Sequence, residues 1–255
     1  MIKKIVSLIL IFMGIISIQT TYAYWAKDVS DSNTSSTSQI SIGTWLFTGG
    51  INYDFEEQDN LSDILADGAT IALGSFNNSR SYIRSNYGLM YIPNERASYT
   101  LTVNAQILNR SGNGYGILFD SIATNMSSQS DTGYIVQYDR GYANGEIILR
   151  PRINGSEQAP VYRYSVNFDN NGNFTTSNGS KNNSNAWWFE EHEFKIVVSI
   201  IDHSSMQKSV SIYIDDEFLF SYDYTSTLIT NQVADNLIGL RTWSGNVAFY
   251  QLDIQ

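Results

Sequence analysis

Alternation of apolar and polar residues is the clearest pattern in this chain. Every second residue is apolar from Leu101 to Ile107, and Thr, Asn or Gln lies between these positions. A period of two belongs to a strand with one buried face, and no helix has it. The same period returns in residues 192–202 and 208–214. A strand that is buried on one face needs a second sheet to cover that face, so the alternation predicts an antiparallel β-sandwich.

Shorter apolar runs, separated by stretches rich in Gly, Ser and Asn, predict the remaining strands. These runs occupy residues 71–74, 82–85, 87–92, 114–121, 133–140, 145–153, 161–166, 218–222, 237–243 and 247–254. Asp215-Asp216 predicts a two-residue hairpin turn, and we expect Ser244-Gly245-Asn246 to join the last two strands as a pair. Residues 167–186 predict a long loop with a short hairpin around Phe174. The sequence contains no repeat of 20–50 residues, which argues against a propeller or a solenoid.

The first 23 residues have the pattern of a signal peptide. Two lysines, Lys3 and Lys4, precede an apolar run over residues 5–18, and Thr21-Tyr22-Ala23 offers small residues for cleavage after Ala23. The apolar run, of about 14 residues, is shorter than the roughly 20 that a membrane-spanning helix needs. We therefore expect an N-terminal signal helix, export, and no membrane attachment after cleavage. A retained anchor is the alternative.

The rest of the chain divides by composition. Residues 24–48 predict a polar linker that carries a short strand at Ile42-Gly43-Thr44-Trp45. Residues 49–70 predict an irregular or short helical connection, with a turn or two of helix at 61–66. Residues 71–255 predict a single sandwich domain.

Composition excludes several classes of protein. The 255 residues contain 15 Lys and Arg against 25 Asp and Glu, a formal net charge of −10. Such a chain repels phosphate backbones and anionic lipids, so we expect no nucleic-acid partner. It has no cysteine and two histidines, which excludes disulfides, thiolate metal sites and histidine-rich zinc sites. A cysteine-free chain rich in Asn and Ser is typical of proteins secreted by Gram-positive bacteria.

Two parts of the sequence resemble known protein families. The aromatic pair after the cleavage site, the polar spacer and IGTW resemble the N-terminus of camelysin-like and biofilm-fibre proteins. This resemblance covers about the first 45 residues and implies a place at the cell surface or in an extracellular matrix. Over residues 71–255, the succession GYGILFDS, GYIVQYDRG, GEIILRPRI, HEFKIVVS, SVSIYIDDEFLF and IGLRTWSGNVAFYQLDI resembles the concanavalin A-like lectin/glucanase jelly roll. The laminin-G-like and 3-keto-disaccharide-hydrolase-like branches are the most similar.

The resemblance implies an all-β, two-sheet antiparallel jelly roll but leaves the activity open, because such folds carry lectins, hydrolases, lyases and structural modules. Glucanases of this fold carry a Glu-x-Asp-x-(x)-Glu run on one strand, which places an acid and a nucleophile on one face. The corresponding strand here offers Gln137 and Asp139. Glutamine is neither a nucleophile nor a general acid. We therefore do not expect an enzyme, although a glycoside-cleaving enzyme of unusual mechanism is an alternative.

Polar and aromatic residues on the outer sides of three predicted strands form the candidate binding face. Each lies opposite its strand's apolar row, and Tyr142 from a nearby loop lies at the rim. The set is Gln137, Asp139, Tyr142, Arg150, Arg152, Arg241 and Trp243. Arginine and glutamine offer donors in fixed geometry, and an aromatic ring suits the apolar side of a sugar. The set predicts a carbohydrate-binding face. The alternative is a solvated face whose arginines and aspartates pair with each other.

Other aromatic and acidic residues have weaker interpretations. We expect Trp187 and Trp188 to plug one end of the sandwich, although they could rim a groove, and we expect His192 to be an exposed strand residue. No cofactor is required. The resemblance to laminin-G-like modules leaves room for a structural calcium ion, with Asp120, Asp131 and Asp169 as candidate ligands. A turn rich in Asn and Gly explains the same residues.

Two functions follow as hypotheses. The first is a secreted, non-catalytic protein that binds an extracellular glycan at the cell surface or in a biofilm matrix. The second is a structural or adhesive fibre subunit, in which residues 40–47 add a strand to the exposed sheet edge of another copy.

Overall fold

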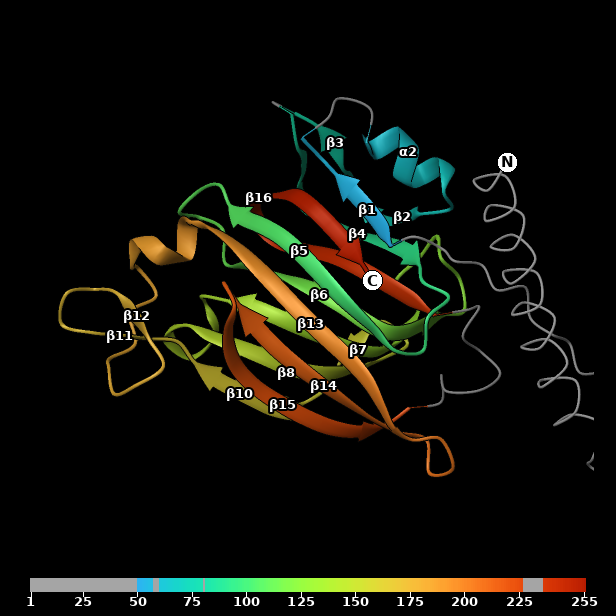
Figure 1. Ribbon diagram of the computed structural model, residues 1–255. Helices are drawn as coiled ribbons and strands as arrows, with labels where there is room; N and C mark the ends of the chain where they lie inside the picture. The colour runs from blue at the N-terminus through green and yellow to red at the C-terminus, as the bar shows by residue number, and fades with distance from the viewer. Residues whose placement is uncertain (1–49, 57–59, 80, 227–235) are drawn as a thin grey trace, which may run out of the picture. The chain divides into compact units, whose positions relative to one another are not determined.

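The computed structural model describes residues 50–56, 60–79, 81–226 and 236–255 (Figure 1). Its elements, in chain order, are β1 (Ile51–Asp54), α2 (Asn60–Ala66), β2 (Thr70–Gly74), β3 (Asn77–Asn78), β4 (Ile83–Pro93), β5 (Tyr99–Ile107), β6 (Gly114–Ala123), β7 (Asp131–Asp139), η1 (Tyr142–Asn144), β8 (Glu146–Ile153), β9 (Ser156–Glu157), β10 (Tyr162–Ser165), β11 (Asn167–Phe168), β12 (Phe174–Thr175), η2 (Ala186–Phe189), β13 (Glu191–Asp202), β14 (Gln207–Ile214), β15 (Glu217–Thr225) and β16 (Leu237–Ile254).

The strands form two layers in which every pairing is antiparallel. The first layer has the order β10-β8-β7-β6-β16-β4-β2. The second layer has the order β15-β14-β13-β5-β16, and β1 and the start of β4 pair with the far side of β16. The predicted all-β, two-sheet antiparallel sandwich is confirmed.

The apolar rows that the alternation predicts meet between the layers. Leu101 and Val103 of β5, Phe194 and Ile196 of β13, and Ile212 of β14 are all buried in one continuous core. Cross-strand partners on β5 and β13 keep these rows in register, with Leu101 opposite Ile196. Burying one such side chain contributes about 1.5–3 kcal/mol relative to leaving it in water.

The last strand belongs to both layers. Residues 237–243 pair with β4 and β6, whereas 247–254 pair with β5 and β1. Between them Ser244 (φ 86°) and Gly245 (φ 76°) adopt left-handed backbone conformations, and a Cβ at Gly245 would lie 2.2 Å from the Cα of Gly112. The expected pair of strands joined by a turn is therefore wrong. Left-handed residues also make the bulges by which a strand changes sheets, and here they bend one continuous strand.

The segment before Ile71 contributes to the sandwich. Strand β1 extends the second layer by pairing with β16, and α2 buries Ile64 in the main core. The sheets thus include residues from the range where the sequence predicts an irregular or short helical connection. Among the described residues, no helix has the length and hydropathy of a membrane span.

Several predicted segments lie outside the described residues. They are the signal helix with its cleavage site at Ala23, the polar linker and the Ile42–Trp45 strand. Strand addition by residues 40–47 therefore stays a prediction. Size-exclusion chromatography and electron microscopy of the mature chain, with and without residues 24–48, would test it.

One end of the sandwich is closed by aromatic side chains, as predicted. Trp187 and Trp188 of η2 are buried, and both rings pack against Tyr138. His192 is buried beside them. Its Nδ1 lies 2.7 Å from a carboxylate oxygen of Asp215, and its Nε2 lies 2.7 Å from the carbonyl oxygen of Trp187. The expectation of an exposed His192 is wrong, because the alternation of β13 places this residue on the same inner face as Phe194.

Candidate functional site

The candidate residues share the outer face of the first layer. On β8 the even-numbered residues, Arg150 and Arg152 among them, point away from the core, since Ile147 and Leu149 point into it. Pairing in register brings Ile148 opposite Gln137 of β7, Gln137 opposite Gly116 of β6, and Gly116 opposite Arg241 of β16. Four adjacent strands therefore supply side chains to this one face.

Four of the predicted residues converge on a glutamate. The carboxylate of Glu157 accepts hydrogen bonds from Gln137 Nε2 at 3.0 Å and from Arg150 Nη1 at 3.1 Å. It also accepts one from Arg241 Nη1, and Arg152 Nη1 lies 3.5 Å from the same oxygen, Oε1. We call these five residues the Glu157 cluster. The structure thus brings Gln137, Arg150, Arg152 and Arg241 together, as the sequence predicts.

Glu157 itself is absent from the sequence prediction. It lies on β9, directly opposite Arg152, after a two-residue turn at Asn154 (φ 48°) and Gly155 (φ 76°). An Asn-Gly pair after a strand is a strong hairpin signal, and it would have returned Glu157 to the face of Arg152. The contact with Arg241 shows that this carboxylate reaches β16 although β7 and β6 lie between β8 and β16.

Asp131 fixes the orientation of the Arg152 side chain. Its Nε and Nη2 bond to the two oxygens of the Asp131 carboxylate at 2.5 and 3.0 Å, and the Tyr91 hydroxyl donates to the same carboxylate at 2.5 Å. Both side chains of the ion pair are fully buried. A bidentate pair of this kind sets the orientation of the guanidinium, so Arg152 presents Nη1 to Glu157 in one direction.

The same face concentrates positive charge in an acidic protein. Arg163 and Lys181 both pair with Glu146 of β8. Burial raises the pKa of Glu146, but hydrogen bonds from Arg163 and Lys181 outweigh this effect, so its pKa is lowered. Burial lowers the pKa of Arg241, and Glu157 opposes that shift.

Asp139 and Tyr142 form a loop structure at the edge of the face. The Asp139 carboxylate accepts backbone N–H bonds from Gly141 at 2.9 Å and Tyr142 at 3.0 Å. Burial raises the pKa of Asp139, and these two bonds offset part of the shift. The Tyr142 ring lies 5.5 Å from the Arg150 guanidinium and 5.1 Å from that of Arg163. Asp139 thus holds the η1 loop, and the loop holds an aromatic ring against the arginines.

Trp243 lies at the other edge of the face, where its ring packs against glycines of β6. A Cβ at Gly114 would come within 2.9 Å of the Trp243 ring and one at Gly116 within 3.3 Å, so the ring packs on bare backbone. The guanidinium of Arg241 lies 5.6 Å from its centroid. Tyr87, directly opposite Trp243 on β4, is 51% exposed and adds a second aromatic ring. The sequence prediction missed Tyr87, although Tyr87 and Tyr91 alternate on their strand.

The acidic residues considered as calcium ligands have other partners. Asp131 binds Arg152, as described above. Asp120 binds the buried Lys208 and accepts a 2.5 Å hydrogen bond from Ser226 Oγ. Asp169 accepts backbone N–H bonds from Asn171 and Asn173, and the bonds from Asn173 lower its pKa.

These surroundings do not fit a calcium ion, because the Asp120 and Asp131 carboxylates face cations of the protein itself. Within the described ranges, no three His, Cys, Asp or Glu side chains lie close enough to hold a metal ion.

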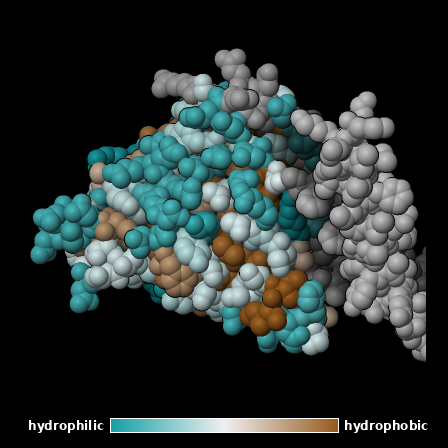
Figure 2. All heavy atoms as spheres, in the orientation of Figure 1, coloured by the Kyte–Doolittle hydropathy of each residue, from teal (hydrophilic) through white to brown (hydrophobic). Residues whose placement is uncertain are grey.

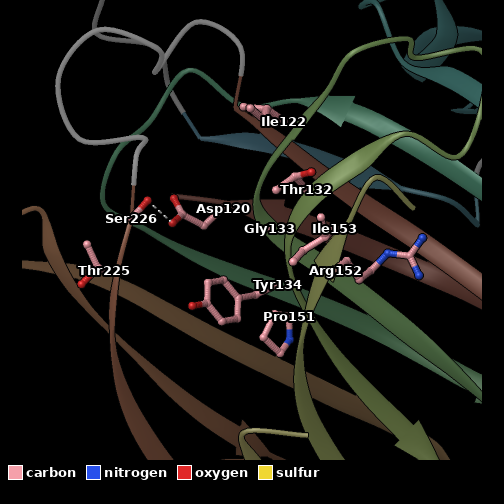
Figure 3. Close-up of a pocket in the computed structure, with 10 residues that line it drawn as sticks. All are labelled: Asp120, Ile122, Thr132, Gly133, Tyr134, Pro151, Arg152, Ile153, Thr225 and Ser226. Carbon is pink, nitrogen blue, oxygen red and sulfur yellow. Dashed lines mark hydrogen bonds between the residues drawn. The ribbon is translucent and has the colours of Figure 1, made fainter. Parts of the chain in front are cut away.

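Asp120 lines a pocket of about 210 Å³ between β6, β7, β8 and the end of β15, and Arg152 of the Glu157 cluster lines it too. Tyr134, Pro151 and Ser226 line it as well, and Figure 3 shows the guanidinium of Arg152 pointing away from Asp120. Asp120 has φ 47°, at a bulge in β6.

Comparison with known proteins places the fold. Neither a protein-family model nor a curated protein sequence matches the chain. The carbohydrate recognition domain of Emp46p is similar in structure, with a TM-score of 0.52, 6% sequence identity, and coverage of 80% of this chain and 94% of that one. A legume lectin-like domain from Entamoeba histolytica has a TM-score of 0.50 and 10% identity, with coverage of 79% and 95%. The fold is a concanavalin A-like jelly roll.

An alginate lyase is similar with a TM-score of 0.45 and 12% identity, covering 81% of this chain and 95% of the lyase. At these identities the likeness concerns the fold alone. The activity of this jelly roll must therefore be argued from its own side chains.

Proposed function

We propose that this protein is a non-catalytic glycan-binding protein that acts outside the cell, through the outer face of the first layer. The observation that carries the proposal is the convergence of Gln137, Arg150, Arg152 and Arg241, with Trp243 and Tyr87 beside them. The jelly-roll neighbours described above, a carbohydrate recognition domain and a lectin-like domain, add support from the fold.

The chemistry of the face suits sugars. Guanidinium and carboxamide groups are planar donors with fixed directions, which match hydroxyl and carboxyl oxygens arranged around a sugar ring. Aromatic rings offer a flat apolar surface to the C–H side of that ring. Tyr87 and Trp243 are neighbours on adjacent strands, so a sugar on this edge would meet both kinds of group.

The carboxylates of the face support binding without cleavage. Glycoside hydrolysis requires two carboxyl groups that flank the scissile bond, one of them as an acid. Here Asp131 binds Arg152, Glu146 binds Arg163 and Lys181, and Asp139 binds the η1 backbone. The predicted signal peptide over residues 1–23 supports export to the cell surface or the surrounding matrix.

Binding to a glycan array, followed by titration calorimetry with the best ligands, tests this proposal. We expect Trp243→Ala and Arg241→Ala each to weaken binding about tenfold or more, as loss of an aromatic contact or a charge-assisted hydrogen bond does. Tyr213→Ala is the matched control, because Tyr213 pairs with Lys195 at 5.1 Å in the second layer as Trp243 pairs with Arg241 in the first. This control should bind normally.

Three results would contradict the proposal. They are the absence of any bound glycan, binding that Trp243→Ala and Arg241→Ala leave unchanged, and shortening of the bound oligosaccharide during incubation. The last result would show catalysis.

A further inference from the structure

We propose that the ligand is an acidic glycan, and that Glu157 occupies the place of the ligand's carboxylate when no ligand is bound. This inference rests on the proposed function and names the class of sugar that the same face binds. Glu157 thereby acts as an internal substitute for the ligand, and the ligand must displace it.

The geometry around Glu157 is that of a carboxylate-binding site. Donors reach its two oxygens from β7, β8 and β16, which are Gln137, Arg150 and Arg241. Arginine binds planar carboxylates through its fork of N–H groups, and here three guanidinium groups lie around one carboxylate. The glutamate comes from a two-residue strand, β9, at a hairpin tip.

The site has more hydrogen-bonding groups than Glu157 satisfies. Arg150 Nε, Arg152 Nη1 and Gln137 Oε1 are buried and make no hydrogen bond to the described residues, although Arg152 Nη1 lies 3.5 Å from Glu157 Oε1. Gln137 is 2% exposed and Arg152 is 1% exposed. Unpartnered buried groups are costly, so a ligand that reaches them gains affinity.

These unpartnered groups call for a sugar acid in preference to a simple anion. Two of them are N–H donors, which suit a carboxylate or a ring oxygen. The third, Gln137 Oε1, is an acceptor and needs a hydroxyl or amide donor. A uronic or sialic acid carries a carboxylate and hydroxyl groups on one ring, whereas a sulfate ion carries no donor.

The arginines keep their positions without Glu157. Arg152 is held by Asp131, Arg150 lies against the Tyr142 ring, and Arg241 lies against the Trp243 ring. Each guanidinium therefore has a second contact that remains when Glu157 leaves. A site that is organised in advance costs less conformational entropy on binding.

Glu157 is the member of the cluster best able to leave. Its side chain is 25% exposed, against 13% for Arg150, 15% for Arg241 and 0% for Arg152. Rotation of this side chain into water would open the site from the solvent side while the β9 backbone stays paired with β8.

Charge balance favours an acidic ligand over a neutral one. If a neutral sugar displaced Glu157, three largely buried guanidinium groups would lose the carboxylate that they share, and an uncompensated buried charge is strongly unfavourable. A ligand carboxylate exchanges one negative charge for another. The exchange therefore preserves the ion pairs of the site and adds the sugar's hydroxyl and ring contacts.

Titration calorimetry with matched sugars tests the inference on the intact mature protein. The probes are oligosaccharides of galacturonic, glucuronic and sialic acid, each with a counterpart whose carboxyl groups are methyl esters, and dextran sulfate as a plain polyanion. We expect at least one acidic oligosaccharide to bind about tenfold or more tightly than its ester, because the ester loses the charge-assisted hydrogen bonds. This comparison uses the wild-type protein alone and depends on no variant.

A variant pair then tests the role of Glu157. Glu157→Gln removes the competing carboxylate, so we expect it to bind the acidic oligosaccharide about fivefold or more tightly, on the population-shift principle that removing a competing state raises the apparent affinity. Glu217→Gln makes the same change of charge at an exposed site on β15 of the second layer and should leave affinity unchanged.

The outcomes separate the inference from the proposed function. If neutral glycans or methyl esters bind as well as acids, the inference falls and glycan binding stands. If no carbohydrate binds, both fall. Dextran sulfate binding as tightly as the acidic oligosaccharides would overturn the inference in favour of general polyanion attraction. Equal effects of Glu157→Gln and Glu217→Gln would overturn the role of Glu157.

Discussion

The outer faces of the two layers carry the same strand alternation but very different surroundings. In the second layer, β5 and β14 alternate between buried core residues and half-exposed Thr, Ser and Asn. Figure 2 shows the view from this side as mostly hydrophilic or pale, with brown hydrophobic patches low in the picture. In the first layer, β6 is buried on both faces from Gly114 to Ser121, and β7 and β8 bury Gln137 and Arg152 on their outer side.

This difference between the two outer faces shows which side chains need a partner within the protein. On the second layer, the outward Ser and Thr side chains are half-exposed. On the first layer, Glu157 lies over the outward side chains, and Arg150, Arg152 and Arg241 each pair with a carboxylate. Buried charges require such partners, whereas exposed ones do not. The face that departs from simple alternation is also the face that carries the candidate site.

The largest loss of stability is expected when the buried ion pair of the first layer is broken. Asp131→Asn should lower the free energy of unfolding by about 3–5 kcal/mol, because it removes the bidentate carboxylate partner of the fully buried Arg152. The matched change on the second layer is Asp216→Asn, which removes a partner of Lys195 whose side chain is 81% exposed. It should cost less than about 1 kcal/mol. Urea denaturation of both variants measures the contrast, and similar losses would contradict it.

A smaller loss of stability is expected from adding a side chain to the crowded outer face of β6. A Cβ at Gly116 would lie 2.5 Å from the Ile135 side chain, so Gly116→Ala forces neighbours to shift. We expect a loss of about 1–3 kcal/mol, as overpacking of a filled site gives. Ser211→Ala, on the outer side of β14, should change stability by no more than about 0.5 kcal/mol. Thermal unfolding distinguishes the two, and a neutral Gly116→Ala would show that the first layer is open there.

The smallest effect depends on pH. Glu146→Gln should cost about 1–2 kcal/mol at neutral pH, since it weakens charge-assisted hydrogen bonds from Arg163 and Lys181. Because folding lowers the pKa of Glu146, its contribution is fully present above the unfolded value of about 4.3 and is lost as pH falls through the lowered value. Denaturation at several pH values should show the gap closing below about pH 4. A gap that persists unchanged in acid would refute this.

Sequence patterns predicted the fold where a single principle determines the structure. The rows through Leu101 and Phe194 are core rows because a period of two has one structural solution. The Asp215-Asp216 turn has φ 50° and 63°, as a tight hairpin requires. The same rule, applied to His192, would have placed it inside.

Long-range relations were harder to predict. Ser244-Gly245 specifies a bend, but only the positions of β5 and β6 decide whether the chain returns or changes layers. Gln137, Arg150 and Arg241 were found from their strands, whereas Glu157 joins them through a hairpin that folds across the sheet. The local sequence predicts the Asn154-Gly155 turn, but it does not predict that Glu157 lies near β16.

The path of β16 through both layers sets the order of events during biosynthesis. Neither layer can be completed until residues 237–254 have been made, because this stretch pairs with β1, β4, β5 and β6. Contacts between segments so far apart in sequence form slowly. Pairing of this last strand then places Arg241 and Trp243 beside the other candidate residues in one late step.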